Sequence, residues 1–203
     1  MKYYSLNHNS SPTSFMKAVI NGLAPDKGLY FPQEKVILSK DFIESIKNID
    51  DVEICYEVMN KYVGDEIPKQ KLIEIINNTI SFKIPLKKIE ESIYSLELFH
   101  GPTLAFKDIG AKFMAQCLDY FKSSYSSKKI TVLVATSGDT GGAVAKGFSG
   151  TKDIEVCILY PKGKISKVQE RQITTNGDYV KAIEVEGDFD KCQSMVKLSL
   201  IHI

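Results

Sequence analysis

Two segments of the chain combine residue types that could carry chemistry. The first is LELFHGPTLAFKD at 96–108, in which Lys107 stands near the start of a predicted amphipathic helix. The second is ATSGDTGG at 135–142, a glycine-rich stretch between a predicted strand and a predicted helix. A lysine amine is a nucleophile and a proton carrier when it is neutral. A glycine-rich turn exposes backbone amides that can bind an anion.

The position of Lys107 in the first turn of its helix bears on the pKa of its amine. The partial positive charge of a helix N-terminus disfavours a second positive charge there. Desolvation against Phe106 would act in the same direction. Both effects predict a lowered pKa and more neutral amine for a Schiff base with a carbonyl group. Most lysines near helix starts are nevertheless solvated and inert, so this position alone leaves both interpretations open.

The glycine-rich stretch also has two interpretations. Backbone amides at a helix N-terminus, in a turn that glycine keeps open, form a general anion site. The GxxxxGK[ST] pattern of a nucleotide-phosphate loop is missing from the sequence. The alternative is an ordinary strand-to-helix turn, and the stretch by itself does not decide between them.

The elements that position these segments change in kind near residue 90. Before it, Thr13 can cap a short helix that Gly22 closes. A helix around 51–63 ends at Gly64, and Pro68 can open another. We therefore expect a mainly helical region over residues 1–90.

Residues 91–203 alternate between strand and helix patterns. Strands are predicted at 93–99, 130–136, 154–161 and 179–187, and helices from near 103, from 143, at 165–177 and at 188–200. The β-branched run at 130–136 is typical of a strand that is buried on both faces. The alternation predicts an α/β fold with parallel strands and right-handed helical crossovers.

Composition argues against several classes of partner. The net charge is +1 and Arg171 is the only arginine, so neither nucleic acid nor an anionic membrane is expected as a partner. The four cysteines are far apart and the three histidines do not cluster, so no metal site is expected. The N-terminus has no secretory pattern and no apolar run could span a bilayer, which makes the cytoplasm the expected location.

The sequence around Lys107 resembles that of a known family. Glu97 and the run from Thr103 to Ala111 resemble the attachment signature of the serine/threonine dehydratase group of pyridoxal-phosphate enzymes. The string ELFHGPTLAFKD resembles, more narrowly, the bacterial threonine synthases. The segments at 15–32, 160–177 and 186–197 are similar to the same family, so the resemblance runs from about residue 15 to residue 197.

The resemblance implies a fold and a set of site residues. The region 91–203 would be the first part of a three-layer α/β/α domain of the tryptophan synthase β-like type, following the helical region 1–90 of threonine synthases. Lys107 would carry pyridoxal 5'-phosphate. Cofactor contacts are implied for Phe106 and Asp139, and substrate contacts for Ser137, Gly138, Thr140, Gly141 and Lys164. Asp139 stands where many members of the wider superfamily have asparagine.

The implied activity is conversion of O-phospho-L-homoserine and water to L-threonine and phosphate, the last step of threonine biosynthesis. The family continues past residue 197 with a long second half, so we expect a truncated chain that binds the cofactor weakly or not at all and is inactive alone. Two alternatives stay open, a serine/threonine dehydratase-like enzyme of the same fold and a non-catalytic remnant. Phosphate release from phosphohomoserine, as against ketoacid formation from threonine, separates the first alternative from the synthase.

Overall fold

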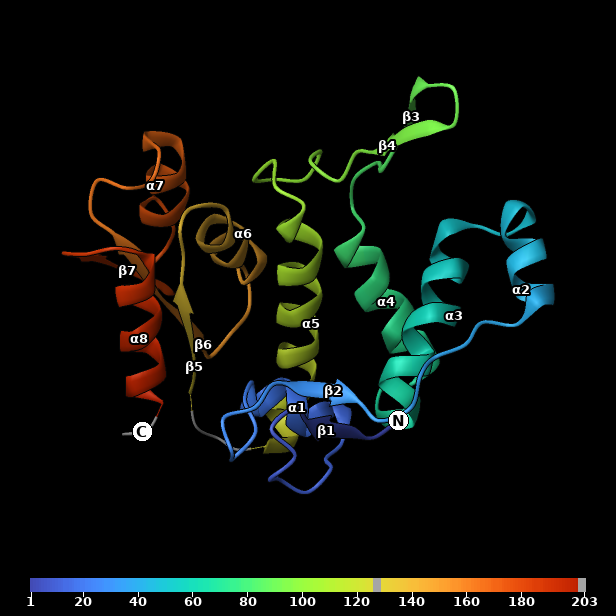
Figure 1. Ribbon diagram of the computed structural model, residues 1–203, viewed down its shortest axis with the longest axis horizontal. Helices are drawn as coiled ribbons and strands as arrows, with labels where there is room; N and C mark the ends of the chain where they lie inside the picture. Colours follow the sequence, from blue (N-terminus) through green and yellow to red (C-terminus); the bar gives the residue numbers. More distant parts are fainter. Residues whose placement is uncertain (126–128, 201–203) are drawn as a thin grey trace. The chain divides into compact units, whose positions relative to one another are not determined.

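The computed structural model describes residues 1–125 and 129–200, with the side chains of residues 123–125 excepted. It divides into two compact units, an N-terminal unit of residues 1–78 and a C-terminal unit that begins at Thr79 (Figure 1). In the described ranges, no helix has the length and apolar character needed to cross a membrane.

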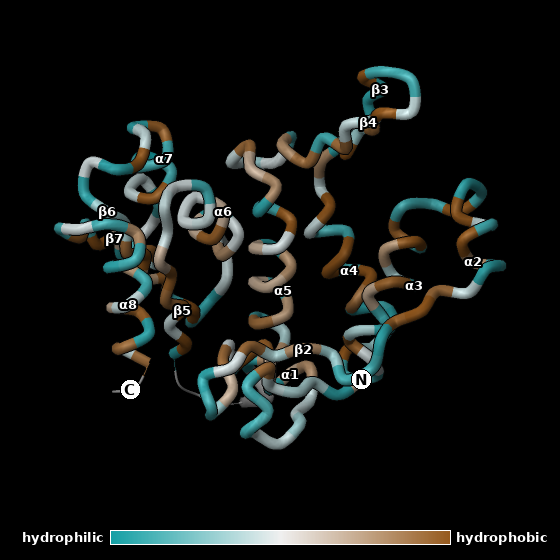
Figure 2. The backbone as a smooth tube through the Cα atoms, viewed as in Figure 1, coloured by the Kyte–Doolittle hydropathy of each residue, from teal (hydrophilic) through white to brown (hydrophobic). Residues whose placement is uncertain are grey.

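The N-terminal unit is mostly helical, as the sequence predicts. It contains α1 (Phe15–Asn21), α2 (Lys40–Ser45), α3 (Asp51–Val63) and α4 (Lys69–Thr79), with short 3₁₀ turns at Ile46–Asn48 and Gly64–Glu66. The predictions for α3 and α4 are confirmed, and Leu72, Ile75 and Ile76 of α4 are buried. Figure 2 shows apolar residues of α4 alternating with hydrophilic ones, as in an amphipathic helix.

Two details of the N-terminal unit differ from the sequence prediction. Ser14 caps α1 by accepting a hydrogen bond from the Lys17 amide, whereas Thr13 forms a β-bridge with Tyr3. The unit also contains an unpredicted antiparallel pair, β1 (Tyr3–Ser5) and β2 (Tyr30–Pro32), because three-residue strands are too short to give a periodic pattern.

The C-terminal unit begins with a hairpin of β3 (Leu86–Glu90) and β4 (Ile93–Leu96). The strand predicted at 93–99 therefore ends at Leu96. Its partner β3 was not predicted, because the sequence places no alternating apolar face there. Large apolar side chains are exposed on both strands of this hairpin: Leu86, Ile89, Ile93, Tyr94 and Leu96.

A parallel three-stranded sheet follows, made of β5 (Ile130–Ala135), β6 (Ile154–Pro161) and β7 (Val180–Val185) in the order β5-β6-β7. This confirms the predicted parallel α/β fold. The central strand β6 is almost wholly buried. Strand β5 lies at an edge and is only partly buried, so the prediction that both of its faces are buried is wrong.

Helices lie on both sides of this sheet (Figure 1). Helix α8 (Phe189–Ser199) packs on β5 and β6, with buried Cys192 against Leu159 and Val185. Helix α6 (Asp139–Gly147) contacts β6, and α7 (Lys167–Thr174) contacts β7. Helix α5 (Lys107–Tyr125) packs against α6.

Two helices start at other residues than the sequence suggests. Helix α5 begins at Lys107 and not near Thr103, because the segment before it folds into turns in which Leu104 has a φ of 61°. Helix α6 begins at Asp139 and not at Ala143, so DTGG forms its first turn. Lys107 is still a first-turn residue, as expected.

Helix α6 is built from small residues because its neighbours approach it closely. A Cβ atom at Gly147 would lie 3.0 Å from the backbone carbon of Ala111 in α5. One at Gly141 would lie 2.7 Å from the Thr136 methyl group and 2.9 Å from Ile173 in α7. Helix α6 therefore has neighbouring helices within van der Waals contact of its backbone on two sides.

We predict that Gly147→Ala lowers the free energy of unfolding by about 1–3 kcal/mol, because the methyl group would meet backbone that cannot rotate away. Urea denaturation of the chain measures this change. The matched control is Gly110→Ala in α5, where an added Cβ meets nothing within 4 Å. That substitution should stabilise by about 0.5–1 kcal/mol through helix propensity. Equal effects of the two substitutions would contradict the close packing described for α6.

Candidate functional site

The loop that precedes Lys107 is folded back onto the start of α5. The carboxylate of Asp108 accepts hydrogen bonds from the Thr103 amide at 2.9 Å and from the Thr103 hydroxyl at 2.5 Å. Asp108 is only 4% exposed, and a Cβ at Gly101 would lie 2.5 Å from its carboxylate. Asp108 thus fixes residues 101–106 against the first turn of the helix.

Lys107 is partly exposed at the N-terminus of α5. Its Nζ lies 4.8 Å from the centroid of the Phe106 ring, which is itself exposed. Within the described ranges, the amine makes no ion pair with a carboxylate. The neighbouring Asp108 is engaged by Thr103, so the contact of the Lys107 amine seen among the described residues is with the Phe106 ring.

The glycine-rich turn is organised by one buried hydroxyl group. Thr136 follows β5 and has no exposed surface. Its Oγ1 accepts hydrogen bonds from the amides of Gly138 at 3.0 Å and Gly141 at 2.8 Å, and it donates to the Gly138 carbonyl at 3.1 Å. Gly138 has a φ of 145°, a backbone conformation that a side chain disfavours.

The predicted substrate residues occupy this turn and the start of α6. Ser137 and Asp139 are exposed, Thr140 is partly exposed, and Gly138 and Gly141 are buried. The Gly141 amide is used by Thr136, which gives this glycine a structural role. The first amides of a helix have no intrahelical partner. The turn therefore presents polar groups at a helix N-terminus, where an anion is favoured.

Helix α7 connects this turn to the loop before Lys107. Gln169 Nε2 donates to Asp139 Oδ1 at 2.8 Å, and Gln172 Nε2 donates to the Thr103 carbonyl at 3.2 Å. Sequence reasoning missed both glutamines and Thr136. The S-x-x-Q spacing of Ser166 and Gln169 signals the capping box that starts α7, but not the contact with Asp139.

Among the described residues, Lys164 forms no hydrogen bond or ion pair with the other candidate residues. Lys164 is exposed in the turn after β6, where its amide donates to the Pro161 carbonyl at 3.2 Å. The nearby Lys162 is paired with Glu186 at 2.6 Å. The substrate-phosphate role of Lys164 stays a prediction.

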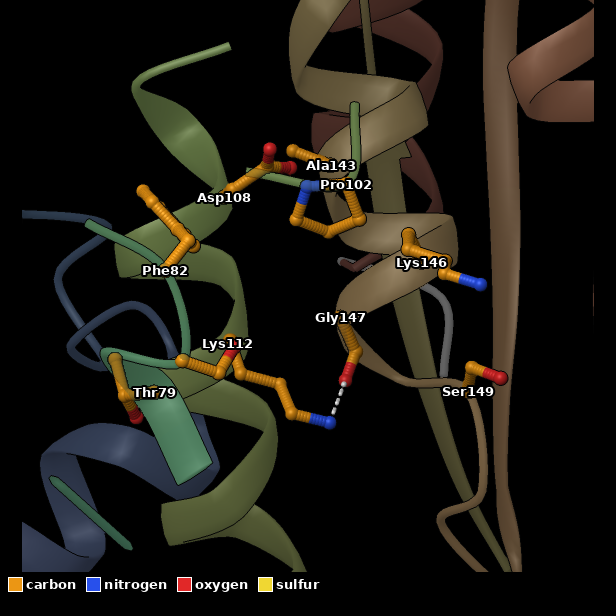
Figure 3. A pocket seen from close by; sticks show the side chains of 10 residues that line it. Thr79, Phe82, Pro102, Asp108, Lys112, Ala143, Lys146, Gly147 and Ser149 are labelled. Carbon is orange, nitrogen blue, oxygen red and sulfur yellow. Dashed lines mark hydrogen bonds between the residues drawn. The ribbon is translucent and has the colours of Figure 1, made fainter. Parts of the chain in front are cut away.

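A cavity of about 260 Å³ lies between α5 and α6, next to this loop but apart from the candidate residues (Figure 3). Asp108, Lys112, Lys146 and Gly147 are among the residues that line it, and the Lys112 side chain reaches toward the Gly147 carbonyl at 3.5 Å. None of the eight predicted site residues lines the cavity. The candidate residues therefore lie outside this cavity, and Phe106, Ser137, Asp139 and Lys164 among them are exposed.

Comparisons with known proteins agree over almost the whole chain. Residues 2–80 match the family model described as threonine synthase N terminus. Threonine synthase from Haemophilus influenzae is 44% identical and that from Escherichia coli 42% identical, in each case over 97% of this chain and 45% of the relative.

Solved structures give the same result. Escherichia coli threonine synthase superposes with a TM-score of 0.92 at 41% identity, covering 100% of this chain and 46% of that one. A pyridoxal-phosphate-bound threonine synthase from Brucella melitensis superposes with a TM-score of 0.88 at 37% identity, covering 99% of this chain and 44% of that one.

The sheet, the helix-start lysine and the glycine-rich turn define an α/β protein in which Lys107 and the turn at 137–140 lie at helix N-termini. Their order in the chain and the matches identify it as an N-terminal portion of the threonine synthase family. The chain spans a little under half the length of the relatives it matches. The matches named above support threonine synthase and give no support to the dehydratase-like alternative.

We predict that Thr136→Val destabilises the chain by about 2 kcal/mol, because it leaves the buried amides of Gly138 and Gly141 without their acceptor. Urea denaturation measures the stability, and hydrogen exchange of residues 137–142 should accelerate. Thr131→Val is the matched control, since Thr131 is exposed on β5. Its effect should stay within about 0.5 kcal/mol. If Thr136→Val behaves like this control, the hydroxyl does not organise the turn.

Proposed function

We propose that this chain is the portion of a threonine synthase that supplies the cofactor lysine, Lys107, and the turn at 137–140 that binds the substrate carboxylate. The reaction is conversion of O-phospho-L-homoserine and water to L-threonine and phosphate, in a protein that joins this portion to the remainder found in the relatives. The observation that carries the proposal is Lys107, a free amine at the start of α5 inside a segment that matches the family.

The described residues fit pyridoxal phosphate, the cofactor that the Brucella relative binds. A covalent attachment needs an amine that no carboxylate holds, and Lys107 meets that requirement because Thr103 engages Asp108. A substrate carboxylate needs accessible donors at a helix N-terminus, and exposed Ser137 and partly exposed Thr140 offer them. When bound, the cofactor supplies an electron sink that stabilises negative charge on the substrate's carbon atoms.

The chain's own groups then have distinct tasks. Lys107 Nζ holds the cofactor and, once substrate has replaced it there, moves protons at Cα and Cβ of the substrate. Ser137 and Thr140 bind the α-carboxylate and thereby orient the amino acid, while Gly138, whose amide donates to Thr136, shapes the turn that carries them. Phe106 and Asp139 would contact the cofactor, and Lys164 would attract the substrate phosphate.

The partners proposed for this portion are the small-molecule substrate and the remainder of the synthase. Absence of nucleic-acid binding and a cytoplasmic location stay predictions from the sequence. A substrate test separates the proposal from the dehydratase-like alternative. A full-length protein carrying these residues should release phosphate from O-phospho-L-homoserine and form no ketoacid from threonine.

The attachment can be tested on a full-length protein that carries these residues. After incubation with excess pyridoxal phosphate and reduction with borohydride, peptide mapping should find Lys107 labelled above every other lysine, because its amine is free and adjoins the cofactor site. Lys107→Arg keeps the positive charge and should remove the label.

Lys112→Arg, one turn further along α5, is the matched control and should leave the label at Lys107 in place. A label spread evenly over the lysines, or concentrated at another lysine, would overturn the attachment at Lys107.

A further inference from the structure

Helix α7 makes two side-chain contacts that the proposed chemistry does not use. Gln169 and Gln172 are three residues apart, so their side chains lie on one face of the helix. Gln169 contacts the glycine-rich turn at Asp139, and Gln172 contacts the loop before Lys107 at Thr103. These partners are 30 and 69 residues distant in the sequence.

The amide of Gln169 is used on both of its polar atoms. Its Oε1 accepts from the Ser166 amide at 2.9 Å, which fixes the amide plane. Its Nε2 donates to Asp139 Oδ1 at 2.8 Å and so orients the carboxylate. The same amide lies against Gly138, where a Cβ would come within 2.4–2.7 Å of its atoms. Gln169 therefore directs Asp139 and, in this position, occupies the space next to Gly138 that a side chain would need.

Gln172 makes the contact between α7 and the loop before Lys107. Its Nε2 donates to the Thr103 carbonyl at 3.2 Å, while its Oε1 lies 3.0 Å from where a Cβ of Gly142 would stand. Asp108, the residue after Lys107, accepts two hydrogen bonds from Thr103. A continuous series of contacts thus runs from Asp139 through α7 to the first turn of α5.

We propose that Gln169 and Gln172 are positioning residues that set the glycine-rich turn and the Lys107 loop in a fixed relation. The proposal rests on the proposed function for its chemical meaning, because the turn binds substrate and Lys107 holds the cofactor. Gln169 acts through Asp139 and Gly138, and Gln172 acts through Thr103.

Hydrogen exchange of the chain without cofactor tests this directly. Gln169→Ala should accelerate exchange in residues 137–142 by about tenfold, the effect of losing one hydrogen bond to a charged group. Gln172→Ala should accelerate hydrogen exchange in residues 103–108 and leave the exchange rates of residues 137–142 closer to those of the wild type. Ser166→Ala, which breaks the capping box but keeps the contact with Asp139, should affect only the start of α7. Gln193→Ala on α8 controls for loss of a helical glutamine.

A charge exchange separates positioning from helix capping. Gln169→Glu keeps the acceptor for the Ser166 amide but places a carboxylate against Asp139, so exchange in 137–142 should accelerate. Combining it with Asp139→Asn restores a donor and an acceptor in reversed order, and exchange should return to within about twofold of wild type. If Gln169→Ala and Gln172→Ala change exchange only within α7, or the double variant shows no recovery, the proposal is wrong.

Borohydride labelling at limiting pyridoxal phosphate, in a full-length protein that carries these residues, connects the glutamines to the chemistry. Both alanine variants should reduce the label on Lys107 by about tenfold, whereas Gln193→Ala should not. A label that stays at the wild-type level in both variants overturns the positioning role. Absence of label in the wild-type full-length protein would count against the proposed function, while the exchange experiment would still decide the role of the glutamines.

Discussion

The close approach of α6 to its two neighbouring helices is the constraint on which the candidate site depends. Gly147 allows the backbone of α5 to come within van der Waals contact, and Gly141 and Gly142 allow the same for α7. Side chains of ordinary size at these positions would push the helices apart. The short reach of Gln169 and Gln172 to the turn and the loop is available only because the helices are this close.

This packing also explains how a turn with so many glycines keeps one conformation. Glycine loses more conformational freedom on folding than any other residue. The fully buried Thr136 hydroxyl restricts the turn to one conformation through hydrogen bonds with two of its amides and one of its carbonyls. Gly138, the residue before α6, has no side chain to cap the helix, so the capping hydroxyl comes from two residues earlier in the chain.

The sequence predicts the elements whose hydrophobic pattern is long and regular. Helices α3 and α4 and the three parallel strands lie where the pattern places them. Helix starts are less accurate because side-chain contacts decide them. The hydrogen bonds between Asp108 and Thr103 hold the preceding loop in turns, so α5 begins about one turn later than predicted. The hydrogen bond from the Gly141 amide to Thr136 allows α6 to begin within the segment that the sequence predicts to be a turn. The edge position and partial burial of β5 could not be predicted, because the sequence of one strand does not determine the order of strands in the sheet.

Lys107 and the glycine-rich turn could be found from local residue types and from the family resemblance, whereas the glutamines could not. Each contact of Gln169 and Gln172 joins segments that the fold brings together, and no periodicity records such a pair. The same reasoning applies to the surroundings of Lys107. Its sequence neighbour Asp108 carries a carboxylate that could pair with the amine. The three-dimensional structure turns that carboxylate toward Thr103 and buries it, and among the described residues no carboxylate forms an ion pair with Lys107. Thr103 therefore determines which partner Asp108 takes, a choice that the sequence alone does not reveal.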